Sequence, residues 1–274
     1  MHSTAPEPSP FFTAGDRQPA VVPLPRAGAP RGARFVRLRV RDRPGSLAAV
    51  TGHLAEHGVN VLRLEVLTRE AGFAIDDFLL AGPNLQSALD TLGSQAIVLA
   101  NRPGVDLHDP GLAMASACGA VTAAGTAREA CRQLVRAALE LVFAEAGVVC
   151  IREGHSFLRP LASTVADLPV LEDGPMSLLR SSLFSGQCLT ADGRTPWAAA
   201  AFREKLPSGS VLAVPGGSAP FLVLALVRED DARFVSAEVD RLAALMRVAV
   251  GTLQLHDQHY AVTRGRPALG SLRR

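Results

Sequence analysis

Residues 42–61 read DRPGSLAAVTGHLAEHGVNV, and this stretch decides how the first third of the chain folds. Leu47, Val50 and Leu54 recur at the spacing of one helix face, and a Pro-Gly turn stands directly before them. Gly58 ends the pattern, because glycine is common just past the end of a helix. The stretch therefore predicts a turn, an amphipathic helix and a second turn.

Strand patterns flank this helix on both sides. Residues 34–41 alternate apolar side chains with arginines, and residues 59–68 alternate again. Residues 73–82 follow a short glycine-containing loop as a hairpin partner, residues 84–93 form a short helix, and residues 95–102 form a last strand. The order β-α-β-β-α-β predicts a ferredoxin-like split βαβ unit.

A second region of mixed helix and strand follows. Residues 103–120 are rich in Gly, Ala and Ser, so we interpret them as a loosely structured linker. Residues 121–257 predict the order α-β-β-α-β-β-α, from a first helix at 126–147 to a long closing helix at 234–256. The expected fold class is α+β, in which a βαββαβ domain over 34–102 precedes an α/β domain with an antiparallel sheet.

The two ends of the chain show no folding pattern. Residues 1–33 hold seven prolines without apolar periodicity, which predicts a disordered leader. Residues 258–274 form a basic tail, with four arginines among the last eleven residues. The N-terminus lacks the basic start and long apolar core of a secretory signal, so we expect a cytoplasmic protein.

Composition argues against several classes of function. The formal charge is only +2, and the chain has one Trp and one Tyr, so we expect no nucleic-acid partner. No run of about 18 apolar residues appears, so we expect no membrane span. The cysteines contain no CxxC pair, and we interpret all four as reduced thiols, mostly buried: Cys118, Cys131, Cys150 and Cys188. We expect no cofactor.

Two motifs invite a chemical interpretation. HLAEH places His53 and His57 one helical turn apart with Glu56 between them, which is the spacing of an inverted zinc hydrolase. A zinc site also needs a third ligand, and this helix commits its apolar face to the sheet, so we expect no metal. Cys188 has no adjacent cation to stabilise a thiolate, so we favour a buried thiol over a redox thiol.

The arginines of the first domain lie on the sheet face opposite its core. They are Arg37, Arg39, Arg41 and Arg63. We expect this face to be solvated. The alternatives are that it binds an acidic partner, or packs on a second sheet with Glu65 and Asp77 offsetting its charge.

The first domain resembles the ACT domain family. The resemblance rests on DRPGSLAAV after a strand, on LAEHGVNV at the end of the first helix, and on the long hairpin that follows. It implies a regulatory module that binds an amino acid or a similar small metabolite, commonly between two copies. It also implies that the ligand contacts the loop after the first strand and the turn after the first helix.

The candidate ligand-binding residues lie at both ends of the first helix. They are Asp42, Arg43, Pro44, Gly45, Ser46, Leu47, Gly58, Asn60 and Val61. A helix start offers N–H groups to a ligand carboxylate, Gly45 lets the ligand approach the backbone, and Asp42 could accept an ammonium group. Asn60 offers both a donor and an acceptor. The alternative is that these residues only form turns and helix caps.

Residues 121–257 are similar to GAF domains. The similarity rests on SGQCLTADG, on the strands SVLAVP and FLVLALVRED, and on the closing helix FVSAEVDRLAALMRVAVGTLQL. It implies a sensing and dimerising module, with a ligand site between residues 155–163 and 181–188. The residue patterns associated with cyclic nucleotides and bilins are absent, so we expect neither ligand.

Together these features predict a non-catalytic sensor rather than an enzyme. We expect a homodimer that binds an amino acid at an ACT interface and signals through the GAF-like domain to an unknown effector protein. One alternative is a GAF-type cysteine oxidoreductase that uses Cys188 or Cys150 and is regulated by the ACT domain. The other is a dimerisation scaffold that binds no ligand.

Overall fold

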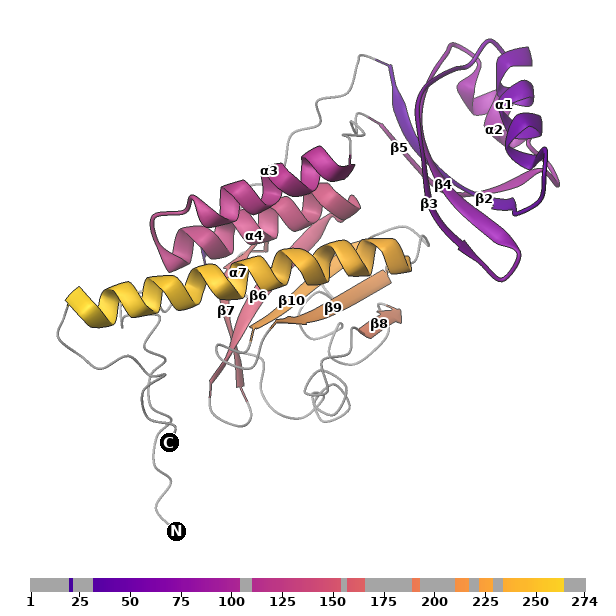
Figure 1. The fold of residues 1–274 in the computed structure, drawn as a ribbon. Coiled ribbons are helices and arrows are strands. Elements are labelled where there is room, and N and C mark those ends of the chain that lie inside the picture. The colour runs from indigo at the N-terminus through magenta and orange to yellow at the C-terminus, as the bar shows by residue number, and fades with distance from the viewer. Residues whose placement is uncertain are drawn as a thin grey trace. The chain divides into compact units, whose positions relative to one another are not determined.

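A computed structural model divides the chain into a four-stranded unit and a six-stranded unit (Figure 1). The described residues are 20–21, 32–103, 110–153, 157–165, 189–192, 210–216, 222–228 and 234–263. The four-stranded unit comprises Arg26–Pro110 and Asp230–Glu238. The six-stranded unit comprises Met1–Pro25, Gly111–Glu229 and Val239–Arg274.

The four-stranded unit has the predicted order β-α-β-β-α-β. Its elements are β2 (Arg34–Arg41), α1 (Ser46–Glu56), β3 (Asn60–Glu70), β4 (Phe73–Ala81), α2 (Leu85–Asp90) and β5 (Ala96–Pro103). All neighbouring strands are antiparallel, in the order β3-β4-β2-β5. The expected α+β class and the ferredoxin-like arrangement are confirmed.

One face of this sheet carries the core of the unit. Alternation turns Val36, Leu38 and Val40 of β2 toward the helices, together with Phe78 and Leu80 of β4. The helices contribute a second row of buried side chains, which is Val50, Leu54, Leu85, Ala88 and Leu89. The same alternation places Arg37 and Asp77 on the opposite face, as a register pair of β2 and β4.

The hairpin between β3 and β4 closes tightly. Its turn is Ala71–Gly72, and both residues have positive φ, at 52° and 78°. Two such residues fit a type I′ turn, which matches the twist of the two strands. This turn lies beside the end of β2, because the Asp42 N–H donates to the Gly72 carbonyl at 2.9 Å.

The six-stranded unit is a mixed sheet with helices. Its elements are β1 (Ala20–Val21), α3 (Pro110–Thr122), α4 (Ala127–Val142), β6 (Ala146–Glu153), β7 (Phe157–Ser163), β8 (Leu189–Asp192), β9 (Ser210–Gly216) and β10 (Leu222–Arg228), with α7 (Ser236–Thr263) from its fourth residue onward. The strand order is β1-β7-β6-β10-β9-β8. Among the described strands, β1 and β7 form the only parallel pair, and the other four pairs are antiparallel.

Two glycines allow the helices to approach this sheet. A Cβ on Gly147 of β6 would lie 2.8 Å from a Leu226 methyl and 3.4 Å from a Leu139 methyl of α4. A Cβ on Gly216 of β9 would lie 2.7 Å from the Met246 methyl of α7. Figure 1 shows α4 and α7 on one face of the sheet, and these glycines lie under them.

The structure differs from the sequence-based expectation at three segments. The linker expected at 103–120 contains most of α3, whereas we expected no regular structure there. The leader expected to be disordered contributes Ala20–Val21 to the sheet as β1. The tail expected from residue 258 begins later, because α7 continues to Thr263. Two further sequence-based predictions, a helix at 177–187 and a short helical or irregular element at 195–207, lie outside the described residues.

None of the described helices is both long enough and apolar enough to cross a membrane.

The N-cap of α4 provides a test of the local structure. The Thr126 hydroxyl accepts a hydrogen bond from the Glu129 N–H at 3.1 Å. We expect Thr126→Ala to lower the free energy of unfolding by about 1 kcal/mol, because it removes the cap. Urea denaturation followed by circular dichroism measures the change. Thr126→Ser keeps the hydroxyl and should restore stability; equal loss in both variants would contradict the cap.

Candidate ligand site

The loop from Asp42 to Gly45 leads from the end of β2 into α1. Gly45 has φ of 84°, in the left-handed region that favours glycine, and its missing Cβ faces open space. Asp42, Arg43, Pro44 and Gly45 are all exposed. The loop therefore presents backbone at the surface at the point where the helix begins.

The N-terminus of α1 has no side-chain cap and no acidic residue in its first turn. The Ser46 N–H donates to the Arg43 carbonyl, and the Ala49 N–H donates to the Gly45 carbonyl. This leaves the N–H groups of Leu47 and Ala48 without a partner among the described residues. Free N–H groups and the positive end of the helix dipole together favour an anion.

Two glycines shape the turn after the C-terminal end of α1. Gly58 has φ of 69°, and its N–H donates to the Ala55 carbonyl. A Cβ on Gly82 would lie 2.7 Å from the Gly58 carbonyl oxygen, so the chain after β4 passes very close to this turn. Asn60 begins β3 with its side chain exposed, whereas Val61 packs against the core.

One copy of the chain does not bring the two groups of candidate residues together. The loop from Asp42 to Leu47 lies at the start of α1, and Gly58 to Val61 lie past its end. A helix of 11 residues spans about 16 Å at 1.5 Å per residue. The side chains of Leu47 and Val61 also pack partly against the core.

Comparison with known protein families identifies the domain that contains α1. The model of the ACT domain family matches residues 34–96. Residues 34–96 are an ACT domain. ACT domains are regulatory ligand-binding domains, and the match includes both ends of α1.

Three solved structures illustrate what the chain resembles elsewhere. The GAF domain/HD domain protein from Geobacter sulfurreducens is 21% identical, with TM-score 0.42, over 52% of this chain and 98% of that one. The GAF domain of a phosphoenolpyruvate-protein phosphotransferase from Coxiella burnetii is 16% identical, with TM-score 0.44, over 57% and 96%. Free methionine-R-sulfoxide reductase from Neisseria meningitidis, in complex with its substrate, is 14% identical, with TM-score 0.46, over 56% and 96%. At these values the likeness says nothing of what this chain binds.

Comparison with curated proteins finds no match.

The histidines of HLAEH connect the two ACT helices. The His53 Nε2 lies 3.0 Å from the Ala88 carbonyl oxygen and 3.1 Å from the Thr91 hydroxyl. The His57 Nδ1 lies 2.9 Å from the His53 carbonyl oxygen, and the His57 Nε2 lies 3.4 Å from the Thr91 hydroxyl. These contacts give both rings a structural role in holding α1 against the residues at the end of α2. Among the described residues, no group of three potential metal ligands occurs.

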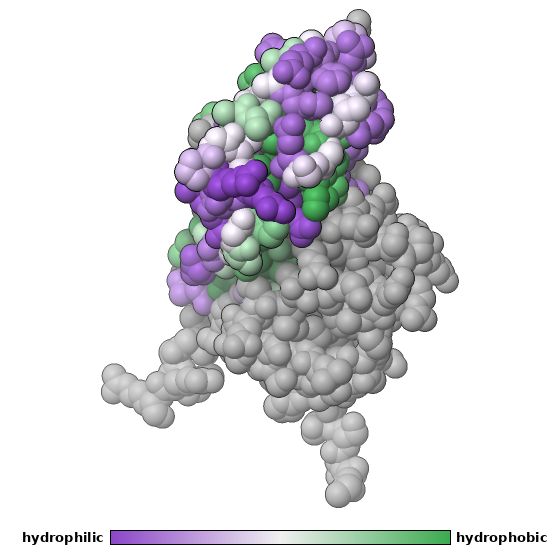
Figure 2. Space-filling view, turned by 90° about the vertical axis from the view of Figure 1, so that its right-hand side faces the viewer, coloured by the Kyte–Doolittle hydropathy of each residue, from purple (hydrophilic) through white to green (hydrophobic). Residues whose placement is uncertain are grey.

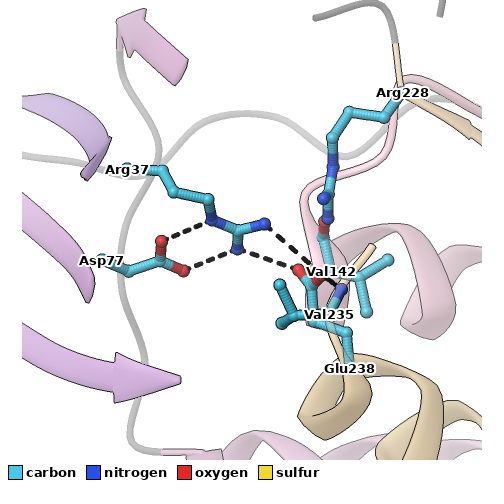
Figure 3. A network of polar contacts seen from close by, with 6 residues as sticks. All are labelled: Arg37, Asp77, Val142, Arg228, Val235 and Glu238. Atoms are coloured by element: carbon cyan, nitrogen blue, oxygen red, sulfur yellow. Dashed lines mark hydrogen bonds and ion pairs between the residues drawn. The ribbon is translucent and has the colours of Figure 1, made fainter. Parts of the chain in front are cut away.

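A buried arginine lies on the opposite face of the ACT sheet, where sequence reasoning expected solvent. Arg37 is 1% exposed and donates to both carboxylate oxygens of Asp77, at 2.7 and 2.8 Å. It also donates to Glu238, at 2.9 and 3.4 Å, and Figure 3 shows the guanidinium between the two carboxylates. The expectation of a solvated face is wrong at Arg37, because two acidic groups compensate its charge.

Arg37, Asp77 and Glu238 form an ion triad in which opposite charges stabilise one another. Burial alone would lower the pKa of the Arg37 guanidinium, but the hydrogen bonds and charges of Asp77 and Glu238 outweigh it and raise the pKa. The Glu238 carboxylate also accepts the Val235 N–H at 2.9 Å. Since α7 begins at Ser236, this bond caps its first turn in the manner of a capping box. The same carboxylate thus binds the ACT sheet and starts the long helix.

The described thiols are buried or half-buried, and two are poor nucleophiles. Burial raises the pKa of Cys131 to about 12, although the charge of Arg159 opposes the change, and burial raises the pKa of Cys150 to about 12. Both side chains are therefore neutral thiols at physiological pH. Cys188 and most of the ligand site expected at 155–163 and 181–188 lie outside the described residues.

Thiol labelling tests this picture. In the folded protein at pH 8, we expect iodoacetamide to leave Cys131 and Cys150 unmodified, because neither forms a thiolate there. The half-buried Cys118 is the internal comparison and should react faster. Peptide mass spectrometry assigns the modified sites, with urea-unfolded protein as the control in which all react. Fast labelling of Cys150 in the folded state would contradict its burial.

The triad makes a quantitative prediction for stability. Arg37→Met should lower the free energy of unfolding by about 3–5 kcal/mol, because it leaves two buried carboxylates without their cation. Urea denaturation followed by circular dichroism measures the change. The matched control is Arg41→Met on the same strand, where the side chain is exposed and the change should stay within about 0.5 kcal/mol. Equal effects at both positions would show that burial of the ion triad contributes nothing.

Proposed function

We propose that this protein is a non-catalytic regulatory sensor whose ACT domain binds an amino acid. The observation that carries the proposal is the start of α1. There an exposed Gly45 turn leads to two backbone N–H groups without a partner among the described residues, and no side chain caps the helix. A carboxylate satisfies those N–H groups and the helix dipole together.

We further propose that two copies of the chain complete the site. Asn60 and the loop from Asp42 to Leu47 lie at opposite ends of α1, so one ligand can contact both only if Asn60 comes from a second copy. The edge strands of the sheet support a homodimer, because each exposes large apolar side chains. They are Leu62 and Val66 on β3, and Ile97 and Val98 on β5. In Figure 2, hydrophobic residues (green) form part of the coloured surface and lie between hydrophilic residues (purple).

The Arg37 triad offers a route by which the signal leaves the ACT sheet. Glu238 binds Arg37 and caps the first turn of α7, and the helix continues along the chain into the six-stranded unit. In this proposal, a ligand that favours one arrangement of the ACT strands changes how the first turn of α7 is held. Such coupling between sites is typically worth about 1–3 kcal/mol.

The proposal is tested by thermal unfolding in the presence of each of the twenty amino acids at millimolar concentration. A ligand at about 100 times its dissociation constant adds about 2.7 kcal/mol of stability, which raises the melting temperature. We expect one or two amino acids to do so in the wild-type chain, and Asn60→Ala to abolish the effect.

A matched control separates loss of a contact from general damage. Asn101→Ala removes the same side chain from β5, at the opposite edge of the ACT sheet, and should keep the response to ligand. Each variant is compared with its own melting temperature without ligand. No response of the wild-type chain to any amino acid would refute the proposed function and favour a scaffold without ligand.

A further inference from the structure

Asp76 on β4 is a buried residue whose carboxylate has one oxygen atom without a hydrogen-bond partner. Its exposed fraction is 2%, and its Oδ1 atom makes no hydrogen bond in the structure. Its neighbour Asp77, by contrast, accepts two hydrogen bonds from Arg37. A buried polar group without a partner destabilises a fold, and such groups are rare unless a ligand or a function explains them.

Asp76 lies on the helix-covered face, toward the loop before α1. Side chains alternate along β4, so Asp76 shares a face with Phe78 and Leu80 of the core, and Asp77 points to the other face. Asp76 is in register with Leu38 and lies closer along the strands to the end of β2 than Phe78 does. This is the end from which the loop beginning at Asp42 leads into α1.

The charged groups around Asp76 would allow a cation to bind its carboxylate. The pKa of Asp76 is raised to about 6, mainly by burial and also by the charges of Asp77 and Asp42, while the charge of Arg69 opposes the change. Arg69 is exposed and lies 3.8 Å from Asp42 rather than in a hydrogen bond with Asp76. At neutral pH the Asp76 carboxylate is thus ionised in a place that disfavours its charge.

We propose that Asp76 binds the ammonium group of the ligand whose carboxylate binds at the start of α1. This inference rests on the proposed function and makes it more specific, because it requires a zwitterionic ligand and excludes carboxylic acids without an amine. It also assigns the ammonium group to Asp76 rather than to Asp42, the residue that the sequence suggested. Asp42 is exposed and lies near Arg69, whereas a buried carboxylate attracts a cation more strongly.

The experiment compares thermal shifts of the wild-type chain, Asp76→Asn and Asp90→Asn at pH 7.5. The probes are the twenty amino acids and, for each that responds, the α-hydroxy acid with the same side chain, such as lactate for alanine. Asp76→Asn keeps the shape of the side chain and removes its charge. Asp90→Asn is the matched control, because Asp90 is an exposed carboxylate on α2 of the same domain.

We expect Asp76→Asn to weaken binding of the responding amino acid by about 10- to 100-fold, the usual effect of losing a charged hydrogen bond. Asp90→Asn should bind like the wild-type chain, and the hydroxy acids should give no shift. Without ligand, Asp76→Asn should melt at a higher temperature than the wild-type chain at pH 7.5, which also shows that the variant is folded.

A second measurement uses the titration of Asp76. Binding of the ammonium group needs the ionised carboxylate, so affinity in the wild-type chain should fall about tenfold from pH 7.5 to pH 5, because the pKa is about 6. This fall should disappear in Asp76→Asn. The groups that act on Asp76 are Asp77 on the same strand, Arg69 on β3 and Asp42 after β2, and all three remain in both chains.

The outcomes separate this inference from the proposed function. If Asn60→Ala loses the response while Asp76→Asn keeps it, the site stands and the role of Asp76 is refuted. A full response to the hydroxy acids refutes that role as well. If no amino acid shifts the wild-type chain, the proposed function fails and the inference fails with it.

Discussion

The ion triad of Arg37, Asp77 and Glu238 is the interaction on which the ACT domain's second face depends. It holds one positive and two negative charges at 1% exposure each, and the cation bonds both carboxylates. Two acidic groups so close together would repel one another strongly without the guanidinium. The planar fork of arginine suits this place, since it meets one carboxylate with two parallel bonds and still has N–H groups for the other.

β4 carries two acidic residues whose environments differ completely. Asp77 turns to the triad and is fully hydrogen-bonded by Arg37, whereas Asp76 turns to the helices and keeps an oxygen without a partner. The strand separates the two groups by a single peptide unit, so the charge of each acts on the other. A change in the charge of one residue therefore changes the electrostatic potential at the other, on the opposite face of the sheet, without any movement of the backbone.

The sequence was sufficient for the fold of the ACT domain and insufficient for its charged face. Alternation in residues 34–41 correctly placed Val36 and Leu38 in the core, because periodicity is a local property. It could not show that Arg37 is buried, since Glu238 lies 201 residues away along the chain. The one available signal was the pair of acidic residues inside the apolar strand FAIDDFLLA, which is unusual in a buried segment.

The other differences have equally physical causes. Small residues dominate α3, from Pro110 to Thr122, so no apolar stripe marked it as a helix. At the candidate site, sequence reasoning identified the residues at both ends of α1 but not Asp76, because no local pattern shows that a carboxylate oxygen lacks a hydrogen-bond partner. Spacing alone also could not show that α1 keeps Asn60 away from the loop at its start.

The short strand β1 affects the tendency of the chain to aggregate. Ala20 and Val21 pair with Ala162 and Ser163 of β7, at one edge of the six-stranded sheet. An open strand edge is a template for pairing with other chains, and covering it is a common protection against aggregation. Proteolytic removal of Ala20 and Val21 would leave every strand of the ACT domain in place and yet open the edge of β7 to pairing with another molecule.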